Sequence, residues 1–152
     1  MIDYIEDDRK CYLVMEYIRG KSLGEYLRDG KRFSVNEIVK YGMEIAEVFS
    51  YFHNRKPPVY YGDLKPDNLM LGENGRLYLI DLGGAVNGYK YQHKVCTGTN
   101  GFAAPEQYEG KINAATDIYT FGKTLSVLCK KTDYLLFIRN MSLFWLIFRC
   151  CM

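Results

Sequence analysis

The sequence lacks a marked excess of charge of either sign. Its 20 lysines and arginines and 18 aspartates and glutamates leave a formal net charge of +2. Without a strong basic excess, a protein has no bulk electrostatic attraction toward nucleic acids or anionic membranes. Neither is expected as a partner here, so any affinity for phosphate must come from local geometry.

Cysteines with metal-type or redox-type spacing are missing as well. None of the five cysteines belongs to a CxxC pair, which argues against a zinc knuckle and against a redox CxxC motif. The acidic N-terminal residues contain no apolar stretch of the kind found in secretory signals. We therefore expect the protein to be located in the reducing cytoplasm.

No apolar run reaches the roughly 20 residues that a membrane-spanning helix needs. The densest runs, residues 135–138 and 143–148, are interrupted by Arg139 and Asn140. We interpret residues 132–152 as an apolar tail that packs in a core or lies exposed, and we do not expect a membrane anchor.

The helix signals that are present are local and clear, in a composition of 48% hydrophobic and 25% charged residues that is typical of a globular domain. Two S-x-x-E patterns, at Ser22 and Ser34, indicate helix starts. The first helix is expected to end at about Arg28. In the second, apolar residues recur at steps of four and three, which predicts a helix from Val35 to about His53.

Short apolar runs predict strands elsewhere. Residues 2–6 and 11–17 flank a turn-forming stretch and are predicted to form a hairpin. Residues 11–15 are nearly all apolar, which favours a buried strand. A further apolar helix is predicted over residues 114–129. Residues 83–101 are rich in Gly, Asn, Thr and Lys, and they are predicted to form a long loop of the functional or mobile kind.

The side chains best suited to chemistry gather in residues 61–68. This stretch holds a carboxylate (Asp63), an ammonium group (Lys65) and an amide (Asn68), and a second carboxylate, Asp81, follows an apolar run. Asp63 can accept a proton from a hydroxyl, and Lys65 can contact a phosphoryl oxygen. Asn68 and Asp81 offer hard oxygens to Mg²⁺. The layout predicts a metal–phosphate site, although each residue alone is also common in turns and on surfaces.

Three motifs in order resemble those of a serine/threonine protein kinase of the bacterial type. They are Asp63-Leu64-Lys65-Pro66-Asp67-Asn68, Asp81-Leu82-Gly83 and Gly98-Thr99-Asn100-Gly101-Phe102-Ala103-Ala104-Pro105-Glu106. Several motifs at workable separations are far more specific than one. The resemblance covers about residues 1–130.

The resemblance implies an α+β fold, namely a mainly helical kinase-like large lobe with a remnant of the small-lobe sheet. A partial kinase domain is expected over residues 1–131. Residues 1–17 would be the small-lobe remnant and hinge strand, and residues 18–131 part of the large lobe. The family further implies ATP and Mg²⁺ as cofactors and a protein with Ser or Thr hydroxyls as substrate.

Roles for single residues follow from the same resemblance. Asp63 matches the catalytic aspartate that orients or deprotonates the substrate hydroxyl, and Lys65 matches the lysine that contacts the transferred phosphate. Thr99 resembles the threonine that hydrogen-bonds both of them. Asn68 and Asp81 match the two Mg²⁺ ligands.

The nucleotide side of the site is implied in the same way. Met15 falls at the gatekeeper position, Glu16 and Ile18 at hinge positions whose backbone binds adenine, and Met70 at the floor of the adenine pocket. Asp117, in the predicted helix over residues 114–129, resembles the aspartate that holds the backbone of the catalytic loop.

Two departures from the family pattern affect these expectations. Tyr61 and Gly62 stand where the family usually has His-Arg, and that Arg is the usual partner of an activation-loop phosphate. Activity is therefore expected not to depend on a phosphate at Thr97. Glu106 is expected to lack the arginine that pairs with it in the family.

A third departure concerns the nucleotide clamp. No G-x-G-x-x-G loop and no strand lysine precede Met15, so a truncated kinase is expected, and an inert kinase-like module that binds a partner or nucleotide is the alternative. Gly62-Asp63-Leu64 also fits the loop of aminoglycoside- and choline-type phosphotransferases. Those enzymes lack the segment at residues 98–106, which favours a protein kinase.

Overall fold

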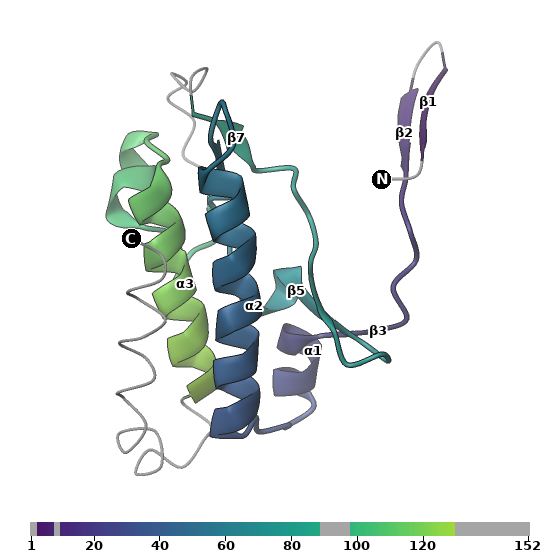
Figure 1. Ribbon diagram of the computed structural model, residues 1–152, viewed down its shortest axis with the longest axis vertical. Helices are drawn as coiled ribbons and strands as arrows, with labels where there is room; N and C mark the ends of the chain where they lie inside the picture. Colours follow the sequence, from purple (N-terminus) through teal and green to yellow (C-terminus); the bar gives the residue numbers. More distant parts are fainter. Residues whose placement is uncertain (1–2, 8–9, 89–97, 130–152) are drawn as a thin grey trace.

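The structure is a computed structural model that describes residues 3–7, 10–88 and 98–129 (Figure 1). The expectations for the apolar tail at residues 132–152 and for Thr97 concern residues outside the described ones. The described chain combines a helical body with small antiparallel sheets, and this confirms the predicted α+β, mainly helical class.

Two long helices form the centre of the molecule. Helices α2 (Val35–His53) and α3 (Ala114–Cys129) lie side by side, with the short α1 (Leu23–Arg28) near one end (Figure 1). The core between them is apolar and includes Ile38, Ile45, Phe49, Phe121, Leu125 and Leu128. The Phe49 and Phe121 rings meet edge to face at a centroid distance of 6.3 Å, an arrangement that aromatic pairs prefer.

Both predicted helix starts are confirmed as capping boxes. The Ser22 hydroxyl accepts a hydrogen bond from the Glu25 amide at 3.1 Å, and the Glu25 carboxylate accepts one from the Ser22 amide at 2.7 Å. Ser34 and Glu37 repeat the pattern at 3.3 and 2.8 Å. Each pair satisfies two amides that the first helical turn leaves without an intrahelical partner.

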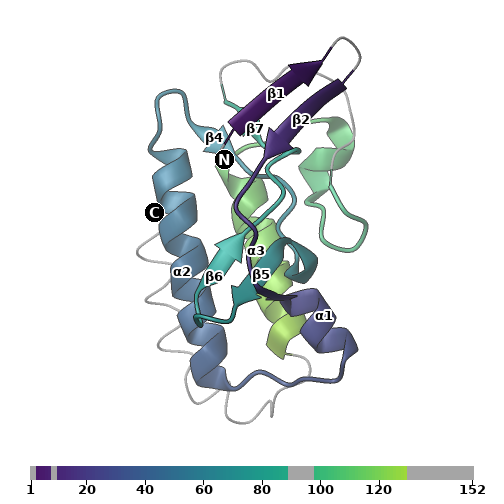
Figure 2. The same cartoon turned by 90° about the vertical axis from the view of Figure 1, so that its right-hand side faces the viewer.

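Small sheets bring the loop at residues 61–68 to its place. Strands β3 (Gly20–Ser22), β5 (Leu69–Gly72) and β6 (Leu77–Leu79) form one antiparallel sheet, and Figure 2 shows β5 and β6 between α2 and α1. Strand β4 (Val59–Tyr60) pairs with β7 (Val86–Asn87). The region predicted as a loop at residues 83–101 therefore contains a short strand.

The N-terminal hairpin is confirmed, but its predicted burial is wrong. Strands β1 (Asp3–Asp7) and β2 (Lys10–Val14) pair antiparallel and stand apart from the helices (Figure 1). Cys11, Tyr12 and Leu13 are exposed, the last with an exposed fraction of 53%. An apolar strand is buried only where another layer covers it, and within the described residues β1 is its only strand neighbour.

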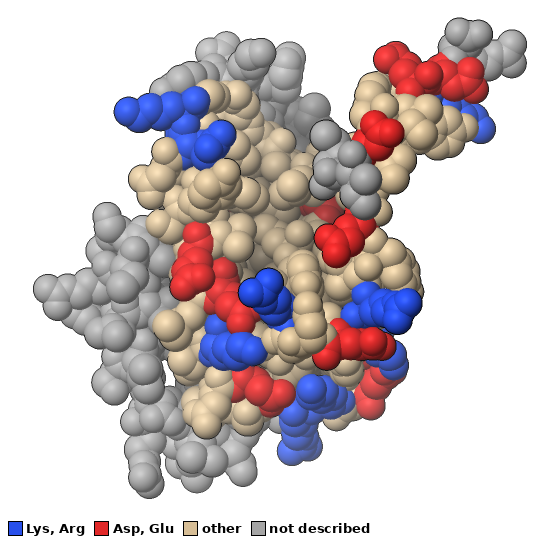
Figure 3. Space-filling view, turned by 45° about the vertical axis from the view of Figure 1, so that its right-hand side comes forward, with Lys and Arg blue, Asp and Glu red and all other residues tan. Residues whose placement is uncertain are grey.

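Neither the charge distribution on one face nor the helices of the described residues point to a strongly charged partner or to a membrane-spanning segment. On the face in Figure 3, lysines and arginines are interspersed with aspartates and glutamates. None of the helices formed by the described residues has the length and apolar content that crossing a bilayer requires.

The buried phenol of Tyr41 in α2 makes stability dependent on alkaline pH. Burial, reinforced by the Glu37 and Glu44 carboxylates, raises the pKa of Tyr41 from 10.0 to about 12. Its stabilising contribution is complete below pH 10, where the phenol is neutral in both states. It is lost between pH 10 and about 12, because the unfolded chain releases the proton first.

We therefore expect wild type to lose about 1.4 kcal/mol of unfolding free energy relative to Tyr41→Phe between pH 9 and pH 11. Urea unfolding at each pH measures the difference. Tyr17→Phe, at a position with an exposed fraction of 84%, is the matched control and should track wild type. A constant gap between wild type and Tyr41→Phe over this range would contradict the prediction.

Candidate active site

The loop at residues 61–68 is anchored by its buried apolar residues. Tyr61 and Leu64 are buried, and the Thr124 hydroxyl of α3 donates to the Leu64 carbonyl at 3.1 Å. The Tyr61 hydroxyl donates to the Ile80 carbonyl at 2.7 Å. Burial raises the pKa of the Tyr61 phenol well above its ordinary value, so it remains a neutral donor.

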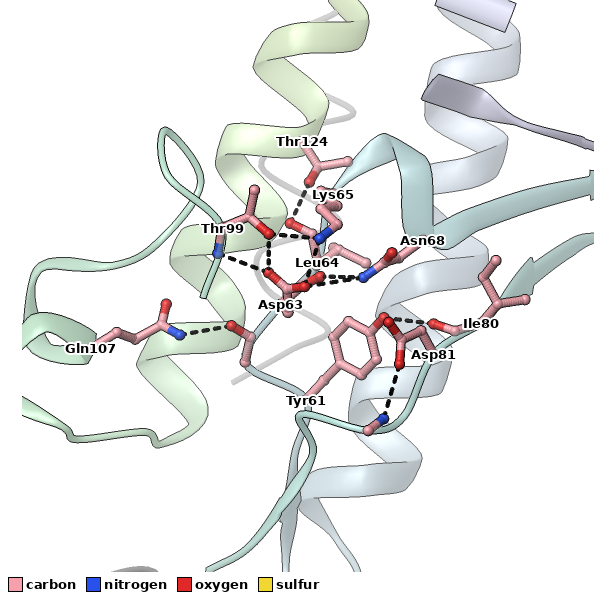
Figure 4. Close-up of polar contacts among 12 residues, drawn as sticks. Tyr61, Asp63, Leu64, Lys65, Asn68, Ile80, Asp81, Thr99, Gln107 and Thr124 are labelled. Carbon is pink, nitrogen blue, oxygen red and sulfur yellow. Dashed lines mark hydrogen bonds and ion pairs between the residues drawn. The ribbon is translucent and has the colours of Figure 1, made fainter. Parts of the chain in front are cut away.

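Asp63 is the centre of a compact polar cluster (Figure 4). Its Oδ1 accepts hydrogen bonds from the Thr99 amide at 3.0 Å and from the Thr99 hydroxyl at 2.7 Å. Its Oδ2 accepts one from Lys65 Nζ at 2.8 Å, and Lys65 Nζ also donates to the Thr99 hydroxyl oxygen at 2.6 Å. The structure thus brings together the three residues predicted to be catalytic, with the carboxylate held in one orientation.

The Asp63 cluster keeps contact with solvent. The Asp63 and Lys65 side chains have exposed fractions of 24% and 21%. A carboxylate that is both fixed and reachable can accept a proton from an incoming hydroxyl, and an adjacent ammonium group can neutralise charge on a phosphoryl oxygen. This arrangement suits proton abstraction beside an anionic group.

The two predicted metal ligands, Asn68 and Asp81, are joined through the backbone. Asn68 is buried, and its amide nitrogen donates to the Asp63 carbonyl at 2.9 Å. The Ile80 amide donates to the Asn68 carbonyl at 2.9 Å. Asp81 is the next residue, and Figure 4 shows its side chain beside Tyr61.

Asp81 has the chemistry and the accessibility of a metal ligand. It is exposed and adopts a left-handed backbone with φ of 61°, an uncommon conformation outside glycine that is often found at functional sites. Its Oδ1 accepts a hydrogen bond from the Gly83 amide at 3.2 Å. A carboxylate with an amide oxygen fits Mg²⁺, which binds few protein oxygens and keeps several waters.

Asp117 of α3 binds the backbone of the loop at residues 61–68, as predicted. Its carboxylate is fully buried and accepts hydrogen bonds from the Gly62 amide at 2.7 Å and the Tyr61 amide at 3.0 Å. His53 Nε2 lies 2.7 Å from the same group. Asp117 does not cap the N-terminus of its helix. The Asn113 side chain does so, because its Oδ1 accepts hydrogen bonds from the Ala115 and Thr116 amides.

Comparison with known proteins decides the family. The sequence matches the family described as protein kinase domain over residues 1–150. The chain belongs to the protein kinase family.

Relatives of this kinase chain include bacterial and eukaryotic serine/threonine kinases. It is 41% identical over 119 residues to serine/threonine-protein kinase PknG of Mycolicibacterium smegmatis, covering 77% of this chain and 14% of the relative. It is 35% identical over 127 residues to Aurora/IPL1-related protein kinase 2 of Caenorhabditis elegans, covering 83% and 40%. Serine/threonine-protein kinase B of Synechocystis is 33% identical over 145 residues, covering 87% and 25%. The kinase chain thus spans less than half the length of these relatives.

The predicted nucleotide residues of the kinase chain are arranged more loosely than the Asp63 cluster. Met15 and Glu16 lie in the exposed segment between β2 and β3, where Met15 has an exposed fraction of 63%. Ile18 follows in the same segment and is half-buried. The segment continues into β3, which pairs with β5. Ser22 of β3 lies opposite Met70, the residue predicted to form the floor of the adenine pocket. Met15 is therefore not a core residue.

The structure bears on two departures from the family pattern in this kinase chain. Gly62 has a φ of 74°, and a Cβ there would lie 3.1 Å from Ile112 Cδ1, so an arginine would be strained at this position. Glu106, for which the family's arginine partner is expected to be missing, accepts a hydrogen bond from the Thr116 hydroxyl at 2.8 Å. The expectation about the arginine stays a prediction.

Sequence reasoning missed two residues that hold the kinase loop. His53 contacts Asp117, and Gln107 is fully buried with its Nε2 donating to the Gly62 carbonyl at 2.7 Å. Gln107 directly follows the recognised segment at residues 98–106, which is the signal that points to it. His53 carried no such signal, because the last turn of a helix commonly ends in a basic residue.

Proposed function

We propose that this chain carries the catalytic part of a serine/threonine protein kinase, which transfers the γ-phosphate of ATP to a protein hydroxyl. The observation that carries the proposal is the Asp63 carboxylate, fixed by Thr99 and Lys65 yet open to solvent. Asp63 takes the proton of the substrate hydroxyl as that oxygen bonds to the γ-phosphorus and ADP leaves. Lys65 stabilises the negative charge on the transferred group.

Asn68 and Asp81 are the residues proposed to hold Mg²⁺. When bound, the metal neutralises charge on the nucleotide phosphates. Met15 at the gatekeeper position, the backbone of Glu16 and Ile18, and Met70 as the floor are proposed to bind the adenine. The β3–β5 pairing, which holds Ser22 opposite Met70, supports this placement.

The proposed substrate is a protein with Ser or Thr hydroxyls, as the names of the bacterial relatives indicate for those kinases. The mixture of charges in Figure 3 gives no support to a nucleic-acid partner. We further propose a cytoplasmic location, which the free state of the described cysteines, Cys11 and Cys129, supports.

The test is label transfer from radiolabelled ATP to a generic basic protein, with the 152-residue chain as enzyme. Wild type should transfer label in the presence of Mg²⁺, and Asp63→Asn should not. If no Asp63-dependent signal appears, the chain is not a kinase in this form.

A second candidate is an inert kinase-like module that binds a nucleotide or a partner. The exposure of Met15 and Glu16 in the segment between β2 and β3 favours it, because this side of the proposed nucleotide site is open. ATP-dependent thermal stabilisation without any label transfer would support this candidate over the kinase.

A further inference from the structure

The amide of Gln107 lies buried between two segments that are far apart in the sequence. Its Nε2 donates to the Gly62 carbonyl at 2.7 Å, and its Oε1 accepts from the Ala104 amide at 2.8 Å. The residue has an exposed fraction of 0%. Gly62 directly precedes Asp63, and Ala104 lies in the segment at residues 98–106 that carries Thr99. One side chain therefore joins the two halves of the Asp63 cluster.

A close contact at Gly98 gives an independent indication that the amide and this segment fit each other. A Cβ on Gly98 would lie 2.8 Å from Gln107 Nε2, and the glycine has a φ of 116°. The Phe102 and Ala103 amides donate to the Thr99 carbonyl at 3.0 and 2.9 Å. The turn that contains Thr99 is therefore closed on itself and rests on Gln107 at both ends.

We propose that Gln107 is a positioning residue that keeps Thr99 on the Asp63 carboxylate. The contacts form a closed ring. The Asp63 carboxylate binds Thr99, and Gly98, the residue before Thr99, packs on Gln107. Gln107 in turn binds the carbonyl of Gly62, the residue before Asp63. Removing the amide leaves the Gly62 carbonyl and the Ala104 amide without these partners in a buried place, which is costly. The segment relieves that cost by moving away from the loop, and Thr99 moves with it.

The test is amide hydrogen exchange of the whole chain, followed by NMR, at the Thr99 amide. In Gln107→Leu we expect the Thr99 amide to exchange about tenfold faster or more, while amides inside α2 and α3 keep their wild-type rates. The matched control is Tyr108→Leu, next in sequence and with an exposed fraction of 60%, which should leave Thr99 unchanged. Wild-type exchange at Thr99 in a folded Gln107→Leu chain would overturn the proposal.

A second variant approaches the ring from the other side. Gly98→Ala leaves Gln107 intact but places a Cβ against its amide and an alanine at a φ of 116°. Both effects should speed exchange at Thr99. It decides the question if Gln107→Leu does not fold, and a Gly98→Ala chain with wild-type exchange at Thr99 would overturn the proposal.

The catalytic consequence rests on the proposed kinase function. In an active chain, Gln107→Leu should lower kcat about tenfold or more with an unchanged KM for ATP, whereas a general loss of folded protein would also lower the amide protection of α2 and α3. If wild type transfers no label, the proposed function fails, and the exchange at Thr99 still decides the role of Gln107.

Discussion

Replacement of Asp63 by asparagine is expected to lower the rate of phosphoryl transfer by about 10²- to 10⁴-fold, the range that a positioned general base contributes. An amide has no basic oxygen that takes up the substrate proton. It also has one acceptor oxygen in place of two, whereas Lys65 and Thr99 present donors to both oxygens of Asp63. The amide NH₂ group would face one of these donors and turn the side chain away.

The loss should appear in kcat, because Asp63 acts on the hydroxyl and the predicted adenine residues lie elsewhere. Initial rates of label transfer at several ATP concentrations separate kcat from KM. The matched control is Asp67→Asn in the same loop, whose carboxylate has an exposed fraction of 46% and pairs with Arg28 at 2.6 Å. That variant should stay within about twofold of wild type, since an exposed ion pair contributes little. Equal losses in both variants would show that the loop tolerates no change, and would leave Asp63 without a special role.

The helices and the grouping of polar side chains in the loop were predictable because their signals are local. The capping boxes at Ser22 and Ser34 bring together residues three apart, and the apolar face of α2 repeats within one helix. Asp63, Lys65 and Asn68 lie within six positions of one another, so their types and spacing could be read directly. Thr99 and Asp117 needed the family resemblance, because they reach the loop from distant segments.

Burial and contacts between segments distant in the sequence were harder to predict. The apolar sequence of β2 says nothing about whether a second layer covers it, and the structure leaves Tyr12 and Leu13 exposed. The pairing of Glu106 with Thr116, and that of Gln107 with Gly62, depend on how α3 and the segment before it fold back on the loop. Apart from the place of Gln107 next to the recognised segment at residues 98–106, no periodicity or short motif indicates such contacts.

Asp117→Asn is expected to lower the free energy of unfolding by about 2 to 3 kcal/mol, the cost of weakening hydrogen bonds to a charged group and leaving a buried donor unsatisfied. The carboxylate is fully buried and accepts from two backbone amides at 2.7 and 3.0 Å. An asparagine can place its oxygen toward Gly62 or toward Tyr61 but not toward both. Either orientation turns an NH₂ group toward a backbone N–H.

Urea unfolding followed by circular dichroism measures the loss in Asp117→Asn, and the matched control is Asp29→Asn. Asp29 pairs with Lys21 at 3.0 Å, but its side chain has an exposed fraction of 56%, so this change should cost under about 1 kcal/mol. Similar midpoints for both variants would contradict a special role for burial at Asp117. A large loss confined to Asp117→Asn would show that the loop geometry is maintained by α3, because the network's carboxylate belongs to that helix. The orientation of Asp63 would then depend on a helix position more than fifty residues further along the chain.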